Sequence, residues 1–483
     1  MRLGVVSLGC DKNTVDSERI VAALAAHGAE AVGDLASADV ILVNTCGFID
    51  AAKEESIQAL LEVSRLKDEG RCRAVVALGC LVERYRDELE PELPEVDLFI
   101  GLRDVDRLIP SLRERGLIGG PVEDHPGVRV PLTDRRHVRY LKVSEGCDHG
   151  CAFCAIPLWR GRHRSFGLEQ LVEEARRLEA QGAVELNLVA QDLAHFGRER
   201  RDGTDVSALL RRLLDETAIP WFRLLYIYSA GLRLPLVELI ASEPRVLPYI
   251  DMPIQHSADP VLRAMRRPER RDTLREKVAW LRSSIPDLTL RTTVLVGFPG
   301  ETDEDFRSLL EFLEETEFDR LGGFAFSPQD GTRAAAMEEQ FLPEGLAQER
   351  LEELLEVQRA ISARRHAREV GSRTEVIVDR AEAGVQGRTK GQADDVDGVT
   401  ELVGAGSGGR HPGGDAADRL APGAIVEAEI TAAHDYDLEA RFLRVLRPAP
   451  RRLGGAEPSA APVAGGRRGL PIAPLGLESG YGR

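Results

Sequence analysis

The sequence predicts an α/β protein with three folded domains: an open parallel α/β sheet at the N-terminus, a partial (β/α)6 TIM-like barrel, and a small antiparallel β-barrel. Three observations support this. Short apolar runs alternate with helix-length polar segments near the N-terminus, which is typical of βαβ units. The alternation resumes with longer units from about residue 137. After Gly371 only short strand-like runs and Gly-rich turns follow.

The N-terminal domain is expected over residues 1–115. Its candidate strands are the apolar runs at 3–8, 40–44 and 74–78. The helical segments between them end at Gly28 and Gly70, residues that commonly terminate helices. A loop rich in Gly, Pro and charged residues follows this domain.

The barrel is expected over residues 133–367. Its helices include 168–182 and 302–316, and a long charged helix at 343–369 closes it. A complete eight-unit barrel usually takes about 250 residues or more, so six units in this length predict an incomplete one. The candidate strands are 140–144, 184–190, 222–228, 247–254, 290–298 and 320–326.

The last folded domain is expected over residues 369–447, with strand-like runs at 374–380 and 424–434. These runs lack a helical period, which favours a small antiparallel barrel. The remaining segment, 448–483, is rich in Pro, Gly and Ala. We expect it to be a disordered tail.

Composition restricts the partners. The net charge is -17, from 63 basic and 80 acidic residues, which disfavours general binding to nucleic-acid backbones. Seven cysteines in 483 residues are an odd number and a low density, which argues against a disulfide framework. We therefore expect the thiols to be free or bound to metal. With no signal peptide and no apolar run of roughly 18 residues, we expect a cytoplasmic protein without a membrane partner. The sequence leaves the oligomeric state open, and a monomer is favoured.

Three cysteines, Cys147, Cys151 and Cys154, form a CxxxCxxC motif just after the first barrel strand. Such close thiols can converge on one metal centre. A zinc site completed by His149 is one possibility, because structural zinc usually takes four protein ligands. The other is an iron-sulfur cluster, in which three cysteines leave one iron open to a small molecule.

Three more cysteines, Cys10, Cys46 and Cys80, each follow one of the N-terminal strands directly. The carboxyl ends of parallel strands lie along one edge of a sheet, where such sheets bind ligands. We therefore expect these thiols to meet at a second site. The alternative is that each is a small buried apolar residue, and Cys72, which precedes its strand, is interpreted as such a bystander.

The run "EGCDHGCAFC" within a six-unit barrel resembles the radical S-adenosylmethionine superfamily. With the three strand-end cysteines and the small β-domain, residues 1 to about 447 resemble its methylthiotransferases. The resemblance implies two [4Fe-4S] clusters, on Cys10, Cys46 and Cys80 and on Cys147, Cys151 and Cys154. The second would bind S-adenosylmethionine.

In these enzymes one S-adenosylmethionine supplies a radical and another a methyl group, while the N-terminal cluster supplies or carries sulfur. The resemblance therefore implies replacement of a C–H bond by C–SCH3. Two segments, "LNLVAQD" and "VLVGFPGET", resemble segments that line the cofactor site in this superfamily. Gln191 and Gly297 are the candidate contacts to the cofactor. A reductant protein such as a flavodoxin or ferredoxin is an expected partner.

Two branches of the family compete, one acting on an aspartate of ribosomal protein S12 and one on adenosine in tRNA. "SLGCDKNTVDSE" at 7–18 resembles the first branch, because Lys12-Asn13 replaces a Gln-Met-Asn-like turn. The last domain resembles TRAM, with 9 basic and 15 acidic residues between Arg368 and Arg444, which suits a basic protein better than tRNA.

The resemblance therefore implies methylthiolation of an S12 aspartate at its β-carbon, giving 3-methylthioaspartate. A tRNA adenosine methylthiotransferase and a zinc-stabilised RNA- or ribosome-binding protein remain the alternatives. Three segments depart from the family pattern: "QDLAHFG", "RHRSF" and "SPQDGTR". Basic clusters at 160–164 and 263–271 are interpreted either as steering groups or as ordinary arginines on helix surfaces.

Overall fold

The computed structural model describes residues 1–121, 129–133, 135–382, 384–404 and 420–450. The segment expected to be a tail lies outside these residues from 451 onward. The chain forms two compact units. Within the described residues, the first contains 1–226 and the short segment 327–335, and the second contains 227–326 and 336–450. Each is described by itself.

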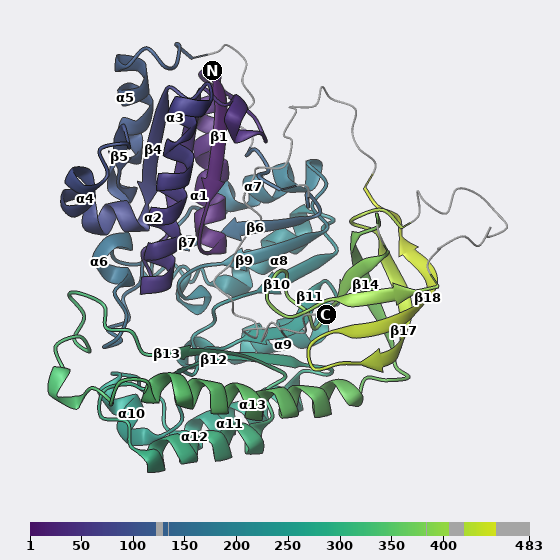
Figure 1. Ribbon diagram of the computed structural model, residues 1–483. Coiled ribbons are helices and arrows are strands. Elements are labelled where there is room, and N and C mark those ends of the chain that lie inside the picture. Colours follow the sequence, from purple (N-terminus) through teal and green to yellow (C-terminus); the bar gives the residue numbers. More distant parts are fainter. Residues whose placement is uncertain (122–128, 134, 383, 405–419, 451–483) are drawn as a thin grey trace, which may run out of the picture. The chain divides into compact units, whose positions relative to one another are not determined.

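The first unit begins with a five-stranded parallel sheet in the order β2-β1-β3-β4-β5 (Figure 1). This confirms the open parallel sheet. Two short strands, β2 and β5, were not expected from the sequence. The strands are β1 (Arg2–Ser7), β2 (Glu30–Ala31), β3 (Val40–Thr45), β4 (Ala74–Gly79) and β5 (Leu98–Ile100). The helices are α1 (Asp11–Ala25), α2 (Asp50–Ser64), α3 (Leu66–Glu69), α4 (Cys80–Glu92) and α5 (Leu108–Glu114), with 3-10 turns at Leu35–Ser37 and Leu102–Arg107.

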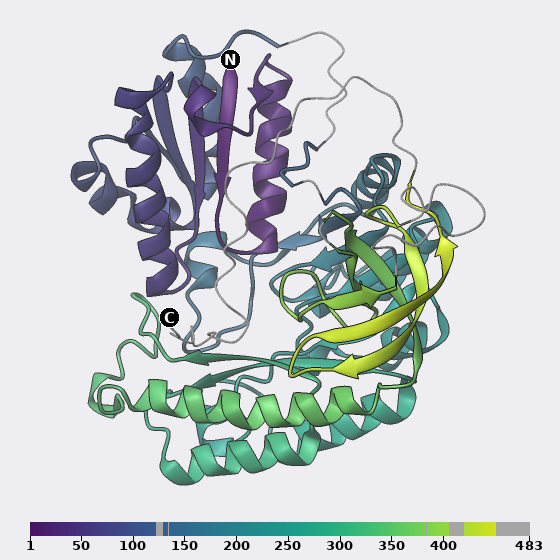
Figure 2. The ribbon, with the colours of Figure 1, turned by 45° about the vertical axis from the view of Figure 1, so that its right-hand side comes forward.

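Both faces of this sheet are covered, because successive strand residues point to opposite sides. On one face Val5 and Leu42 pack with Leu24 of α1. On the other, Ile41 and Val75 pack in a core that includes residues of α2 and α4. Figure 2 shows α1 and α2 on opposite sides of the strands. Burial on both faces explains why these strands are continuous apolar runs instead of alternating ones.

The first unit continues into three parallel barrel strands, with β9 paired to both β6 and β10. Two short strands, β7 and β8, pair antiparallel beside the cysteine motif. The elements are β6 (Val138–Lys142), β7 (Ser144–Glu145), α6 (Ile156–Arg160), β8 (Arg164–Ser165), α7 (Leu168–Ala180), β9 (Glu185–Val189), the 3-10 turn Leu193–His195, α8 (Val206–Glu216) and β10 (Trp221–Leu224).

The second unit holds three further parallel strands, with β12 paired to both β11 and β13. All six barrel strands expected from the sequence are therefore present, three in each unit. The elements are the 3-10 turn Ser229–Gly231, α9 (Leu234–Ser242), β11 (Val246–Asp251), α10 (Asp259–Ala264), α11 (Arg271–Ser284), β12 (Thr289–Val296), α12 (Asp303–Thr316), β13 (Arg320–Ala325), the 3-10 turn Glu338–Gln340 and α13 (Leu346–Ala367).

The second unit ends in a closed five-stranded barrel, as expected, in the order β14-β15-β16-β18-β17. Four of its strand pairs are antiparallel, but β16 and β18 pair in parallel, which differs from the wholly antiparallel barrel expected. Its core contains Val376, Val426 and Ala440. The hydroxyl of Tyr249 in β11 donates to Asp397, 2.5 Å away, which ties the small barrel to the strands of the same unit. The strands are β14 (Arg373–Arg380), β15 (Gln386–Thr389), β16 (Thr400–Val403), β17 (Ile425–Ala433) and β18 (Leu438–Arg447).

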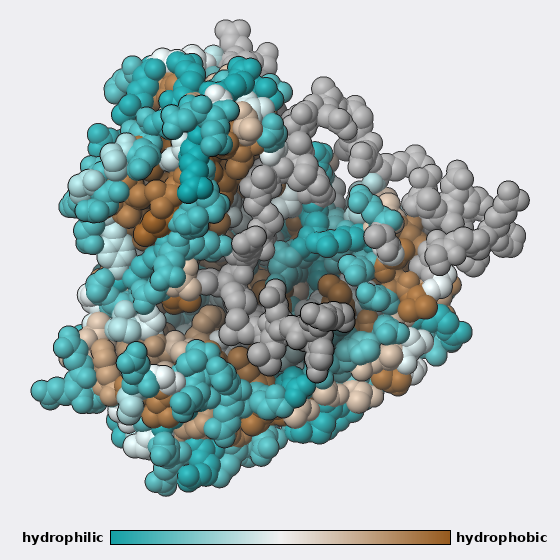
Figure 3. Space-filling model, in the orientation of Figure 1, coloured by the Kyte–Doolittle hydropathy of each residue, from teal (hydrophilic) through white to brown (hydrophobic). Residues whose placement is uncertain are grey.

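Polar side chains cover much of the surface of the N-terminal sheet and its helices, with a hydrophobic strip between them (Figure 3). Among the described residues, no helix combines the length and the apolar character that crossing a membrane requires.

Candidate active site

The three strand-end cysteines follow strands that are direct neighbours in the sheet, β1, β3 and β4. Cys10 is the N-cap of α1, Cys46 follows β3, and Cys80 begins α4. Burial raises the pKa of the Cys46 thiol to about 12, and the neighbouring Cys10 and Cys80 add to that rise. The structure thus brings the three thiols together.

The approach of these loops requires glycine at position 9. Gly9 has φ +82°, and a Cβ built there would lie 2.8 Å from the Sγ of Cys46. Any side chain would therefore push into the thiol group. By contrast, Cys72 lies at the opposite end of β4, where its thiol is buried 3.4 Å from the carbonyl of Ala74. Its position agrees with the bystander interpretation.

The second cysteine set lies in the loop between β7 and α6. The backbone N–H of Cys154 donates to the carbonyl of Cys151 at 3.2 Å, and that of Cys147 donates to Gly161 at 3.1 Å. Burial raises the pKa of the Cys147 thiol to about 11, with Cys151 contributing as a neighbour. The Cys147 and Cys151 thiols are thus neighbours, and Cys154 is tied to Cys151 through the backbone, a donor set suited to an iron-sulfur cluster.

A buried guanidinium connects the two cysteine sets. Arg160 Nη2 lies 3.3 Å from the Sγ of Cys80, and the same atom donates to the side-chain oxygen of Asn13. Its Nη1 donates to Glu145 at 2.9 Å and to Asp16 at 3.3 Å. The side chain is only 3% exposed, so the surface interpretation of the basic cluster is wrong for this residue.

Glu145 extends this connection toward the barrel. Burial would raise the pKa of its carboxyl, but the charges of Lys142 and Arg160 outweigh that effect and lower the pKa to about 2. Glu145 accepts a hydrogen bond from Gln191 Nε2 at 3.0 Å. Gln191 Oε1 is buried and has no hydrogen-bond partner among the described residues, as expected of an atom that faces a ligand site.

Packing within the fold explains why residue 297 is a glycine. Its φ is +75°, and a Cβ would lie 2.3 Å from the Cβ of Ala347 in α13. Its backbone N–H donates to Glu301 at 2.9 Å. The close packing of β12 against α13 therefore requires glycine here, whether or not a cofactor also approaches.

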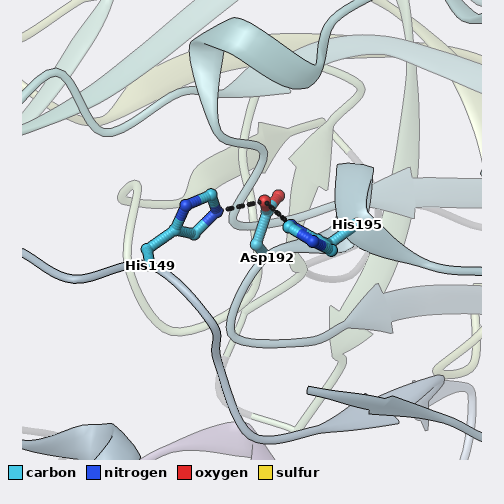
Figure 4. A group of neighbouring side chains, drawn as sticks. All are labelled: His149, Asp192 and His195. Carbon is cyan, nitrogen blue, oxygen red and sulfur yellow. Dashed lines mark hydrogen bonds and ion pairs between the residues drawn. The ribbon is translucent and has the colours of Figure 1, made fainter. Parts of the chain in front are cut away.

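The imidazole ring of His149 contacts the carboxylate of Asp192. Its Nε2 lies 2.7 Å from Asp192 Oδ2, and Nδ1 of His195 lies 3.4 Å from the same oxygen, so the two rings flank it (Figure 4). Asp192 Oδ1 accepts from the backbone of Ala194 at 2.9 Å. This contact links "QDLAHFG" to the CxxxCxxC loop through His149.

Another departing segment, "SPQDGTR", and the residue after it contact both cysteine regions. Ser327 donates to Asp50 at the start of α2, at 2.7 Å. The backbone N–H of Ala334, the residue directly after this segment, donates to the carbonyl of Ala152, inside the CxxxCxxC motif, at 2.9 Å. Sequence reasoning missed this role, because the segment is more than 170 residues from either partner and carries no distinctive motif.

Three family models match the chain. They are "Uncharacterized protein family UPF0004" over residues 2–101, "Radical SAM superfamily" over 141–313 and "TRAM domain" over 370–443. The matches follow the order of the folded domains. The barrel and the closed five-stranded barrel therefore correspond to radical SAM and TRAM domains.

Curated relatives match over nearly the whole length. The ribosomal protein uS12 methylthiotransferase RimO of Anaeromyxobacter sp. (strain K) is 44% identical, over 96% of this chain and 98% of its own. The chain belongs to the RimO family of methylthiotransferases. A RimO from Desulforudis audaxviator is also 44% identical, over 92% of this chain and 98% of its own. The protein is thus a radical SAM transferase, and RimO membership implies S-adenosylmethionine and [4Fe-4S] clusters as cofactors.

Proposed function

We propose that this enzyme methylthiolates the β-carbon of an aspartate in ribosomal protein S12, giving 3-methylthioaspartate. The observation that supports this most directly is the presence of two separate three-thiol sets in one unit of a RimO family member. One set alone would suit radical chemistry, whereas sulfur insertion needs a second centre. A ribosomal substrate implies a cytoplasmic reaction.

Each cofactor has residues that fit it. Cys147, Cys151 and Cys154 would hold one [4Fe-4S] cluster, and Cys10, Cys46 and Cys80 a second. When bound, the clusters and S-adenosylmethionine supply the radical, the sulfur and the methyl group. The chain supplies thiol ligands and fixed charges between the sites.

The residues between the two sets have positioning roles. Arg160 contacts Cys80 and Glu145 together, so it holds the end of the first set against the start of the CxxxCxxC loop. Gln191 is oriented by Glu145 with one amide oxygen left for a ligand, and we assign that oxygen to the methionine moiety of S-adenosylmethionine. Hydrogen abstraction by a radical requires no general base, so none is assigned.

The first experiment measures cluster content and radical chemistry in anaerobically purified protein. We expect about eight irons per chain, from two [4Fe-4S] clusters. Replacing Cys10, Cys46 and Cys80 with alanine should halve the iron and abolish methylthiolation, while reductive cleavage of S-adenosylmethionine continues. Replacing Cys147, Cys151 and Cys154 should abolish cleavage. Colourless protein containing zinc would contradict the proposal.

The second experiment identifies the substrate. The reconstituted enzyme is incubated with reductant, S-adenosylmethionine and either a peptide of the S12 loop or tRNA, and both are analysed by mass spectrometry. We expect the mass of a methylthio group on the aspartate of the peptide. A methylthio group found only on tRNA adenosine would refute the protein substrate. A flavodoxin or ferredoxin can replace the chemical reductant to test the expected electron donor.

A further inference from the structure

A buried ammonium group lies next to the proposed reaction site. Lys12 is only 7% exposed, two residues after Cys10 at the start of α1. Its Nζ lies 3.4 Å from the centre of the Tyr226 ring and 3.4 Å from the carbonyl oxygen of Ala190. Ala190 directly precedes Gln191, so the charge is next to the carboxyl ends of β9 and β10.

The backbone of Tyr226, whose ring contacts this ammonium group, is strained. Tyr226 has φ +61°, a conformation that is unfavourable for a residue with a side chain and is concentrated at functional sites. Its carbonyl accepts from the backbone of Leu193 at 2.9 Å, which fixes the loop after β9 to the end of β10. The ring is thereby held in place as a platform for the cation.

This position matches what the reaction requires of substrate binding. The carbon to be modified is bonded directly to the carboxyl group of the target aspartate. That carboxylate must therefore lie within a few bond lengths of the point where sulfur and radical meet. A carboxylate entering here would find a positive charge already oriented between the first cysteine loop and the barrel strands, so its binding would need little reorganisation.

We propose that Lys12 is a substrate-binding residue that forms an ion pair with the carboxylate of the target aspartate. This inference rests on the proposed function and adds the group that selects aspartate. S-adenosylmethionine also carries a carboxylate, so the two sources must be distinguished. We assign Lys12 to the protein substrate, because Gln191, whose buried amide oxygen has no hydrogen-bond partner among the described residues, is already assigned to the cofactor.

The test is a double-mutant cycle on peptide affinity. Dissociation constants are measured by fluorescence anisotropy on the cluster-loaded enzyme with S-adenosylmethionine and no reductant. The enzymes are wild type and Lys12→Met, and the peptides carry either the target aspartate or asparagine in its place. Close charge pairs couple by about 1.5 kcal/mol or more, so we expect wild type to prefer aspartate by about tenfold or more and Lys12→Met to show no preference.

Controls separate a binding role from a structural one. Lys12→Arg keeps the charge and should retain part of the preference, whereas Lys67→Met, at a partly exposed lysine on α3 of the same domain, should retain all of it. Iron content and circular dichroism verify folding. If Lys12→Met weakens both peptides equally, the effects are additive and the inference is overturned. Loss of S-adenosylmethionine affinity with an unchanged peptide preference would also overturn it.

The two proposals fail in different ways. If wild type neither binds nor modifies the aspartate peptide, the proposed function fails. If wild type modifies the peptide but the cycle shows no coupling, the function stands and only the role of Lys12 is refuted.

Discussion

A buried ion cluster in the first unit provides a quantitative test of how the N-terminal domain is held to the barrel strands. Glu18 of α1 accepts from Arg129 Nε and from Arg139 of β6, both at 3.0 Å. Its side chain is 7% exposed and that of Arg139 is 2% exposed. The perturbation is Glu18→Gln, which keeps the shape and removes the charge.

Removing one member of a buried ion cluster typically costs about 3–5 kcal/mol, because the remaining charges lose their compensation. Here Arg129 keeps Glu174, 2.7 Å away, and Arg139 keeps a hydrogen bond to Gln181. We therefore expect the lower end, about 3 kcal/mol, which corresponds to about 150-fold in an opening equilibrium at 1.4 kcal/mol per tenfold.

The assay is native-state hydrogen exchange at pH 7, followed by mass spectrometry on peptides from α1 and β6. Exchange limited by opening of this region should be about 150-fold faster in Glu18→Gln. The matched control is Glu169→Gln, whose side chain is 77% exposed on α7 and should leave exchange unchanged. Less than a threefold change in Glu18→Gln would refute the reasoning.

The same variant predicts a pH dependence. Burial alone would raise the pKa of Glu18, but the charges of Arg139 and Arg129 outweigh it and hold the pKa below its ordinary value of 4.5. A lowered carboxyl pKa stabilises the fold above the unfolded pKa, and that contribution is lost as the pH falls through the folded pKa. In urea denaturation of cluster-free protein, the gap between wild type and variant should stay constant from about pH 8 to 6 and close only below the ordinary pKa.

Three further predictions concern single residues. Arg160→Gln should lower the reduction potential of the first cluster in an EPR-monitored titration, because a positively charged donor to the Cys80 sulfur is lost. Arg160→Lys should recover part of the potential. Equal potentials in wild type and Arg160→Gln would exclude the contact. Cys72→Ala should keep the full iron content and methylthiolation rate, and a loss of iron would show that this thiol is a ligand. Gly297→Ala should cost about 2–4 kcal/mol in thermal unfolding. Adding Ala347→Gly should recover the steric part of that cost, and no recovery would refute the packing explanation.

Local sequence patterns predicted most of the fold. The six barrel strands and α13 follow from hydrophobic runs and a helical charge pattern within single segments. The strand-end cysteines could also be found, because their position depends only on where each apolar run stops. The short strands β2 and β5 were missed, since two or three residues carry no period.

The environment of the cysteines could not be predicted in the same way. Arg160 lies in α6, a helix of five residues, which is too short to show a buried face in its sequence. Its partners Asn13 and Cys80 are 147 and 80 residues away, and Lys12 is 178 residues from Ala190. Such contacts depend on tertiary packing, and a charged residue gives no sequence signal of burial because most charged residues are exposed.

These buried charges explain how two loops from different domains can form one site. Asp16, Lys142, Glu145 and Arg160 contain two positive and two negative groups, so the set is neutral and its burial is compensated internally. Apolar residues of similar volume could stabilise the junction as well, but they would lack the direction of these hydrogen bonds. The hydrogen bond from Arg160 to Cys80 ties the first cysteine set to the start of the CxxxCxxC loop. In the proposed function, transfer of sulfur from one centre to the other would depend on the distance that this contact maintains.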